Sequence, residues 1–323
     1  MEYKKVQGGE RMDLEWVKAF AAVAETGSFS DAADRLFLAQ SVVSKRIQRL
    51  EGRLGVRLLD RSHRRTALTA AGQRVLPQAQ ALLRQYRMLE QAARPEGGLR
   101  LALLPVADSY GFLQLLSAFS AAHPGFQLTA EERESAALPA LLEDGQFDGA
   151  FYRVTGPALP REAVVLCQDE MALLAPEQEG LSPAGRVPLA QFCSEPFLLL
   201  SAGTGLLEPS IELCRQAGFL PRIRYTGASA ANIARMVRSG AGVALLARQV
   251  AQGCAANGLQ ALPLIPTFCS QLIFAPSRAG LQNPAMPALL AFLRRAAGAD
   301  GPSGGPARKA AAPCLAAKPE SMV

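Results

Sequence analysis

The apolar and polar positions between residues 28 and 72 alternate with the period of an α-helix. Apolar residues recur every three or four positions, at Val43, Ile47, Leu50 and Leu54. They share one helical face, which we predict to be core. The opposite face carries short hydroxyls, an amide and an amine, at Ser41, Ser44, Lys45 and Gln48. Such groups hydrogen-bond base edges and phosphates, so the pattern predicts a helix that reads nucleic acid.

Shorter helices are predicted before this one. Asp13 can cap a helix that runs through Glu25, and Ser30 can cap another that continues to Leu36. Residues 37–39 then form a tight turn. Two short helices joined by three or four residues, with the polar face on the second, are the helix-turn-helix arrangement whose second helix enters the major groove of DNA.

Positive charge is concentrated in the same part of the chain. Residues 1–97 contain 17 Lys and Arg against 11 Asp and Glu, whereas residues 98–323 contain 17 of each. Segments 58–61 and 66–68 can pair as a small ribbon, a basic wing that carries Arg61, Arg64 and Arg65. A basic module attached to a neutral remainder is typical of a DNA-binding head with a separate sensor. The alternative is an ordinary solvated face on a structural helix.

Residues 69 to about 94 have the pattern of one long helix. Apolar residues alternate at intervals of four and three, at Val75, Ala79, Leu82, Tyr86, Leu89 and Ala93. This is the spacing of a coiled-coil seam. Pro77 is expected in an early turn or at a kink. We favour self-association through this seam, with packing of the helix on its own domain as the alternative.

Beyond a Gly- and Pro-containing linker at 94–98, short apolar strands alternate with helical segments, which predicts an α/β sheet with crossover helices. The predicted strands are 99–104, 126–130, 149–152, 164–168, 171–175, 196–200, 221–225, 242–247 and 271–276. The predicted helices are 110–122, 136–143, 206–217, 230–239 and 285–296.

The amino-terminal part resembles the DNA-binding domain of LysR-type transcriptional regulators. The resemblance rests on Ala32, Ala33, Leu36, Gln40, Val43, Ser44, Ile47, Leu50, Glu51, Leu54, Gly55, Leu58, Arg61, Arg64, Leu68, Thr69 and Gly72. Ala39 departs from it, because the family usually has Ser or Thr there to cap the reading helix. Weaker matches, such as Phe147-Asp148 and Gly240-Ala241-Gly242, extend the resemblance to the effector domain of the family.

The resemblance implies an α/β protein overall, with a winged helix-turn-helix, a long linker helix and a two-lobe domain similar to periplasmic binding proteins. The segments are a disordered extension at 1–11, the DNA-binding domain at 12–70, the linker and dimerisation helix at 71–97, the effector-binding domain at 98–297 and a disordered tail at 298–323. It implies a transcriptional regulator that binds double-stranded DNA as a homodimer or homotetramer and responds to a small polar effector.

Carried over by position, the implied DNA-binding residues are Gln40, Ser41, Ser44, Lys45, Arg46, Gln48, Arg49, Arg53, Arg61, Arg64 and Arg65. The residues that should face bases are Gln40, Ser41, Ser44, Lys45 and Gln48. The arginines should mostly bind phosphates or pack against the domain. The implied effector-binding residues are Ser109, Arg153, Ser201, Thr204 and Ser229. Arg153 would be a counter-charge, and the amides around residues 201–205 could hold an anion. Helix capping explains each hydroxyl equally well.

The sequence offers little for catalysis, for a metal or for a cofactor, and we expect none of the three. Its two histidines, His63 and His123, are not placed for a nucleophile triad or a two-His metal site. The six cysteines have no close pair, which argues against a zinc site or a disulfide framework. A redox-sensing pair stays open as an alternative, as do an enzyme or small-molecule binding protein on residues 98–297 and a non-specific nucleoid-type DNA binder.

No apolar run has the length of a membrane span, and the amino terminus lacks the apolar segment of a signal peptide. We therefore expect a cytoplasmic protein without a membrane partner.

Overall fold

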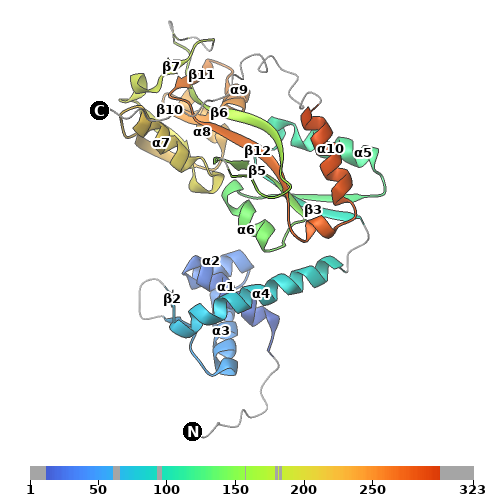
Figure 1. Cartoon of the computed structure of the whole chain (residues 1–323). Helices are drawn as coiled ribbons and strands as arrows, with labels where there is room; N and C mark the ends of the chain where they lie inside the picture. Colours follow the sequence, from blue (N-terminus) through green and yellow to red (C-terminus); the bar gives the residue numbers. More distant parts are fainter. Residues whose placement is uncertain are drawn as a thin grey trace, which may run out of the picture. The chain divides into compact units, whose positions relative to one another are not determined.

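Figure 1 shows the computed structural model of the chain, which describes residues 12–60, 66–92, 97–156, 158–178, 181 and 184–298. The chain divides into two compact units, Met1–Arg94 and Pro95–Val323. The first unit is helical with a small ribbon, and the second is built on a large mixed sheet. The predicted fold class is therefore confirmed.

The first unit contains α1 (Leu14–Thr26), α2 (Phe29–Leu36), α3 (Gln40–Leu54), β1 (Leu59–Asp60), β2 (Ala67–Leu68) and α4 (Ala70–Ala92). Asp13 caps α1 by accepting a hydrogen bond from the N–H of Glu15 at 3.0 Å. The expectation that Ser30 caps α2 is wrong. Ser28 has the extended backbone that a cap needs, and its hydroxyl accepts a hydrogen bond from the N–H of Asp31 at 3.2 Å.

The core of the first unit is formed by the face of α3 that the sequence predicts. Val43, Ile47 and Leu50 are buried there with most of α1. Leu54, also predicted as core, is instead 41% exposed. It is the last residue of α3, and Gly55 then turns the chain with a left-handed φ of 70°. The periodicity is thus correct, but its last position lies beyond the packed part of the helix.

α4 is one long helix with Pro77 inside it, as expected. Ala79 and Leu83 are buried in the core of the same unit. Part of the predicted seam therefore packs on its own domain. Leu82, Met88 and Leu89 remain exposed, at 41%, 47% and 68%.

The second unit has the strand order β4 (Gln127–Glu132), β3 (Gly98–Leu103), β5 (Gly149–Val154), β12 (Cys269–Pro276), β6 (Val164–Pro176), β10 (Val243–Ala247), β8 (Pro196–Leu200) and β9 (Arg222–Gly227). β11 (Leu259–Ile265) also pairs with β6, and with β7 (Val187–Pro188). β3, β4 and β5 are parallel, as are β8, β9 and β10. The antiparallel strands β6 and β12 lie between these two parallel sets.

Each parallel set has its own helices, so the unit has two lobes. The first lobe contacts α5 (Phe112–Ala122), α6 (Leu138–Glu143) and α10 (Met286–Gly298), and Figure 1 shows α5 and α10 side by side. The second contacts α7 (Leu207–Gln216), α8 (Ala230–Arg238) and α9 (Arg248–Cys254).

β6 carries the chain from the first lobe into the second. Residues 164–170 pair with β12, whereas residues 171–176 pair with β10 and β11. The prediction of separate strands at 164–168 and 171–175 is therefore wrong. The charged pair Asp169-Glu170 continues the strand because both side chains have partners within the protein. β11 was missed because it contains Pro263, which single-sequence rules exclude from a paired strand.

Candidate functional site

α3 presents the predicted reading face to solvent while its other face packs on α1. The exposed residues are Gln40, Ser41, Lys45, Gln48, Arg49 and Arg53, and the half-buried ones are Ser44 and Arg46. Because the buried face fixes the helix, the hydrogen-bonding groups are held on a rigid element.

The amino terminus of α3 has no side-chain cap, as the departure at Ala39 implies. Ala39 has the extended backbone of a cap residue, with φ −70° and ψ 143°, but no side-chain acceptor. The preceding turn contains Phe37 in the left-handed conformation, with φ 54° and a side chain that is 94% exposed. The N–H of Val42 donates to the Ala39 carbonyl at 2.9 Å, which leaves the N–H groups of Gln40 and Ser41 as the ones that an acceptor from outside the helix can reach.

Two arginines of α3 contact α1. A guanidinium N–H of Arg46 donates to the carboxylate of Glu15 at 2.9 Å. The guanidinium carbon of Arg49 lies 6.0 Å from the ring centroid of Trp16, which is itself buried. These contacts give both arginines a packing role in joining α3 to α1.

The ribbon of β1 and β2 pairs in antiparallel register, with Leu59 opposite Leu68. The carboxylate of Glu51 accepts hydrogen bonds from the N–H groups of Leu58 and Leu59, at 2.8 and 3.2 Å. One residue of α3 thus fixes the start of the ribbon. The wing residues Arg61, Arg64 and Arg65 lie outside the described residues.

A second candidate site lies at the carboxyl ends of the parallel strands in the two lobes. Ser109 is in the turn η1 (Asp108–Tyr110) after β3, and Arg153 is near the end of β5. Ser201 follows β8, and Ser229 follows β9. Turn η2 (Ser135–Ala137) of the first lobe lies against η4 (Ala202–Thr204) of the second. Ligands of open α/β sheets bind at such strand ends.

Arg153 belongs to a buried polar network between these strand ends. Its guanidinium donates to the hydroxyls of Tyr110 and Ser270, both at 2.5 Å. The Tyr110 hydroxyl donates to the carboxylate of Asp169 at 2.6 Å. Asp169 also accepts from the backbone N–H of Gln249, at 3.3 Å, at the start of α9. The predicted counter-charge for a ligand is therefore already paired within the protein.

Burial governs the protonation of this network. It raises the pKa of Asp169 above its usual range, although the hydrogen bond from Tyr110 and the charge of Arg153 act in the opposite direction. Burial also raises the pKa of the Tyr110 phenol. Tyr110 therefore keeps its proton at neutral pH and acts as the donor to Asp169.

The predicted hydroxyl residues are mostly engaged in local structure. The Thr204 hydroxyl donates to the carbonyl of Ser201 at 2.7 Å, and the Ser229 hydroxyl caps α8 by accepting from the N–H of Asn232 at 3.3 Å. The N–H groups of Thr204 and Gly205 bond within the same turn. The carbonyl of Ser109 accepts from the Gln249 side chain at 2.7 Å. The Thr204 hydroxyl and the N–H groups of Thr204 and Gly205 are donors that an anion would otherwise need.

Sequence reasoning missed Tyr110, Asp169 and Glu134 of this region. The signal for Asp169 was charge inside two mainly apolar strands, Arg153 in β5 and the Asp169-Glu170 pair in β6. Opposite charges in apolar strands indicate a buried pair. Glu134 gave no such signal, since it lies among the other charged residues that follow β4.

The described cysteines form no disulfide, and several have unreactive surroundings. Burial raises the pKa of the Cys167 and Cys214 thiols to about 12. It also raises the pKa of Cys254. A thiol with such a pKa is almost entirely protonated at neutral pH, and the thiolate is the reactive form.

Within the described ranges, no helix combines the length and apolar character needed to cross a membrane. Among the same residues, no group of three or more His, Cys, Asp or Glu side chains could hold a metal ion.

Two family models together cover most of the chain. Residues 14–73 match the model "Bacterial regulatory helix-turn-helix protein, lysR family", and residues 92–298 match "LysR substrate binding domain". A "Probable hydrogen peroxide-inducible genes activator" of Mycobacterium avium is 32% identical over 84% of this chain and 83% of its own length.

Solved structures agree in fold. A mutant of OxyR from Corynebacterium glutamicum is 23% identical and has a TM-score of 0.52, over 89% of this chain and 92% of that chain. Full-length CbnR in complex with its target DNA is 26% identical and has a TM-score of 0.50, over 88% of this chain and 100% of that chain. With its helix-turn-helix unit and its two-lobe domain, this chain belongs to the LysR-type transcriptional regulators, which bind DNA and carry an effector-binding domain.

Proposed function

We propose that the exposed face of α3 reads base edges in the major groove. The observation that carries this proposal is the row of exposed polar side chains opposite the buried residues Val43, Ile47 and Leu50 on one helix. Gln40, Ser41, Ser44, Lys45 and Gln48 take the base-reading roles. Arg53 and the wing residues Arg61, Arg64 and Arg65 take phosphates, whereas Arg46 and Arg49 mainly support α3.

The chain acts as a homodimer or homotetramer in this proposal. The support is two exposed apolar residues of the predicted seam, Leu82 and Leu89, which lie seven residues apart on one face of α4. A symmetric pair of reading helices would then contact successive major grooves roughly 34 Å apart, on a site with dyad symmetry.

The sensor responds to a small polar molecule bound where the loops of the two lobes meet, and not to oxidation of a thiol. The names of several relatives refer to hydrogen peroxide, which makes thiol oxidation the second candidate for this chain. Against oxidation at Cys167 and Cys214 stand their pKa values of about 12, because a protonated thiol reacts slowly with peroxide. Cys193 and Cys269 are exposed, and the peroxide experiment below tests them. A ligand that binds two conformations of the lobes with different affinity would shift the population between them and so change how the protein binds DNA.

The test is capture of fragmented genomic DNA by the purified protein at physiological salt, followed by sequencing. A few sharp peaks that share a dyad are expected, and Ser44→Ala and Gln48→Ala should each change the preferred sequence. Diffuse recovery that is independent of both substitutions would favour the nucleoid-type alternative. Repeating the capture with hydrogen peroxide and with a thiol reductant should give the same peaks, and a peroxide-dependent shift would favour the redox alternative.

A further inference from the structure

Glu134 has one carboxylate oxygen, Oε2, that is buried without a hydrogen-bond partner among the described residues, at the junction of the two lobes. Glu134 immediately precedes η2 in the first lobe, and its side chain lies against Gly203 of η4 in the second. Burying a carboxylate oxygen without a donor costs free energy, so such an atom needs an explanation.

Gly203 leaves space for this carboxylate. A Cβ atom built on Gly203 would lie 3.0 Å from Glu134 Oε2 and 3.1 Å from its carboxyl carbon. The backbone of Gly203 is outside the left-handed region, so its conformation would accept a side chain. A residue larger than glycine at position 203 would therefore displace the Glu134 side chain.

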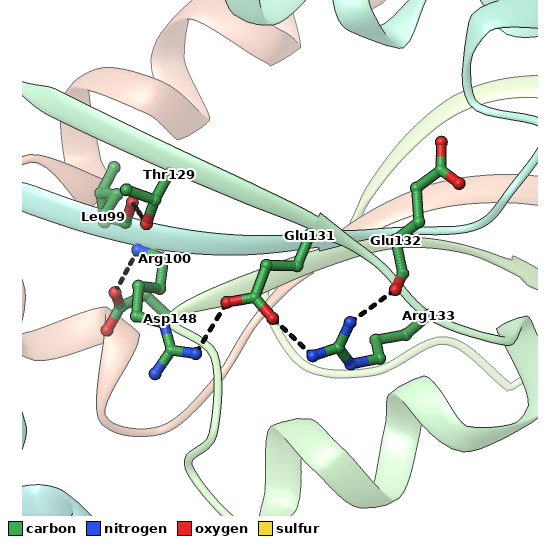
Figure 2. Close-up of polar contacts among 7 residues, drawn as sticks. All are labelled: Leu99, Arg100, Thr129, Glu131, Glu132, Arg133 and Asp148. Atoms are coloured by element: carbon green, nitrogen blue, oxygen red, sulfur yellow. Dashed lines mark hydrogen bonds and ion pairs between the residues drawn. The ribbon is translucent and has the colours of Figure 1, made fainter.

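The adjacent cation in sequence is directed elsewhere. Figure 2 shows the guanidinium of Arg133 between Glu131 and the carbonyl oxygen of Glu132. It donates to Glu131 at 2.5 Å and to the Glu132 carbonyl at 2.7 Å. Its guanidinium carbon also lies 5.7 Å from the ring centroid of Phe147. Arg133 thus has three contacts, and none of them involves Glu134.

Two further arginines lie near this segment. The guanidinium of Arg100 donates to Glu131 at 2.9 Å. Arg153 lies nearby through its backbone N–H, which donates to the hydroxyl of Ser135 at 3.2 Å. Its guanidinium is bonded to Tyr110 and Ser270 and is balanced by Asp169 through the Tyr110 hydroxyl. Asp169 balances the charge of Arg153. Glu134 adds a further negative charge, and none of the contacts of Arg133 or Arg153 described above involves it.

We propose that Glu134 is a specificity-determining residue for an effector that carries an ammonium or guanidinium group. This rests on the sensor site proposed above and names the class of its ligand. The cationic group reaches Glu134 Oε2 when η2 and η4 move apart, donates to it and supplies the missing charge, while the rest of the ligand contacts the loops of both lobes. Binding then links η2 to η4 through the ligand. An anionic ligand would meet uncompensated repulsion here.

A first test needs no ligand and uses the full-length protein. Glu134→Gln keeps the size of the side chain and removes its charge, so the thermal midpoint of the ligand-free protein should rise by about 2–4 °C. Glu132→Gln is the matched control, because Glu132 is exposed on the same segment and should leave the midpoint unchanged. A midpoint that falls in Glu134→Gln would show that the carboxylate already has a donor and would overturn the proposal.

A second test compares shape-matched cations and anions by thermal shift at equal ionic strength. The pairs are benzylamine with benzoate, putrescine with succinate, and methylguanidine with acetate. At least one cation should stabilise the wild type and the Glu132→Gln variant but not Glu134→Gln. Stabilisation by the anions alone, equal stabilisation of all three proteins, or no effect of any cation would each overturn the ligand class.

DNA capture separates this inference from the proposed function. Ligand-free Glu134→Gln should select the same DNA as the wild type, because Glu134 is not part of the reading helix. If the wild type selects no sequence, the proposed function fails whatever the cations do. If selection is normal and the cation tests fail, only the role of Glu134 is wrong.

Discussion

The two units of this protein use their polar side chains in opposite ways. On α3 the hydroxyl, amide and amine groups lie on an exposed face, and the apolar residues beneath them hold the helix in place. At the strand ends of the sensor, Arg153, Tyr110 and Asp169 are buried and bonded to one another. The exposed groups on this face of α3 are accessible to an external partner, whereas Arg153, Tyr110 and Asp169 already have internal partners.

This difference explains why one kind of residue carries different information in the two units. A charge on the exposed face of a helix is weakly constrained by the fold, so it can be selected for binding. Burying a charge costs desolvation free energy, which a partner within the fold must offset. That partner then limits which other groups the charge can bind. Glu134 is informative because its buried Oε2 atom has no such partner among the described residues.

The largest expected effect is a difference in thiol reactivity between the less accessible cysteines of the second unit and an exposed one. At pH 8 a thiol with a pKa of about 12 carries roughly a thousandfold less thiolate than a free cysteine. Cys167 and Cys214 should therefore alkylate far more slowly than the exposed Cys193. Mass spectrometry after timed iodoacetamide treatment measures each rate, with urea-unfolded protein as the control. Equal rates for Cys214 and Cys193 in the folded protein would contradict this.

Removal of Arg153 should strongly destabilise the sensor. Arg153→Ala leaves Asp169 buried without its cation, so the free energy of unfolding should fall by about 3–5 kcal/mol. Urea unfolding of the full chain measures this loss. Because burial raises the pKa of folded Asp169 above its unfolded value, the folded form binds the proton first as pH falls. The deficit should therefore be larger at pH 8 than at pH 5. A deficit that is independent of pH would indicate that lost packing, and not the carboxylate, is responsible.

Capping α3 should stabilise the first unit without changing the sensor. Ala39→Ser places a hydroxyl on a backbone that already has cap geometry, so the unfolding free energy of this unit should increase by about 1 kcal/mol. Ala39→Val has no acceptor and serves as the control. Circular dichroism during thermal unfolding measures both. No gain from the serine would mean that the first N–H groups of α3 already have acceptors.

The smallest expected effect on stability is at Arg46. Arg46→Ala removes a partly exposed pair with Glu15 and should cost less than about 1 kcal/mol. The salt dependence of DNA binding by the Arg46→Ala variant should stay close to that of the wild type. Arg53→Ala, in contrast, should reduce the slope of log affinity against log salt by about 0.9 if Arg53 contacts one phosphate. The reverse pattern would move the phosphate role from Arg53 to Arg46.

The sequence by itself determined the first unit almost completely. The spacing of Val43, Ile47 and Leu50 defined the buried face of α3, and the ribbon and the long helix followed from equally local patterns. Such features depend on residues within one or two helical turns. Leu54 and the cap of α2 were wrong because the ends of helices depend on where the chain turns and packs.

The tertiary structure alone decided the polar network at the strand ends of the second unit. The Arg153–Tyr110–Asp169 network joins residues far apart in sequence, through strands whose pairing no local pattern specifies. The continuity of β6 across both lobes has the same cause, because its second half is stabilised by β10 and β11. Periodicity tells which face of an element is buried, but the partner of a buried charge is set by long-range pairing. For that reason the sequence did not show that Arg153 is paired, nor that Glu134 places a buried oxygen without a partner among the described residues.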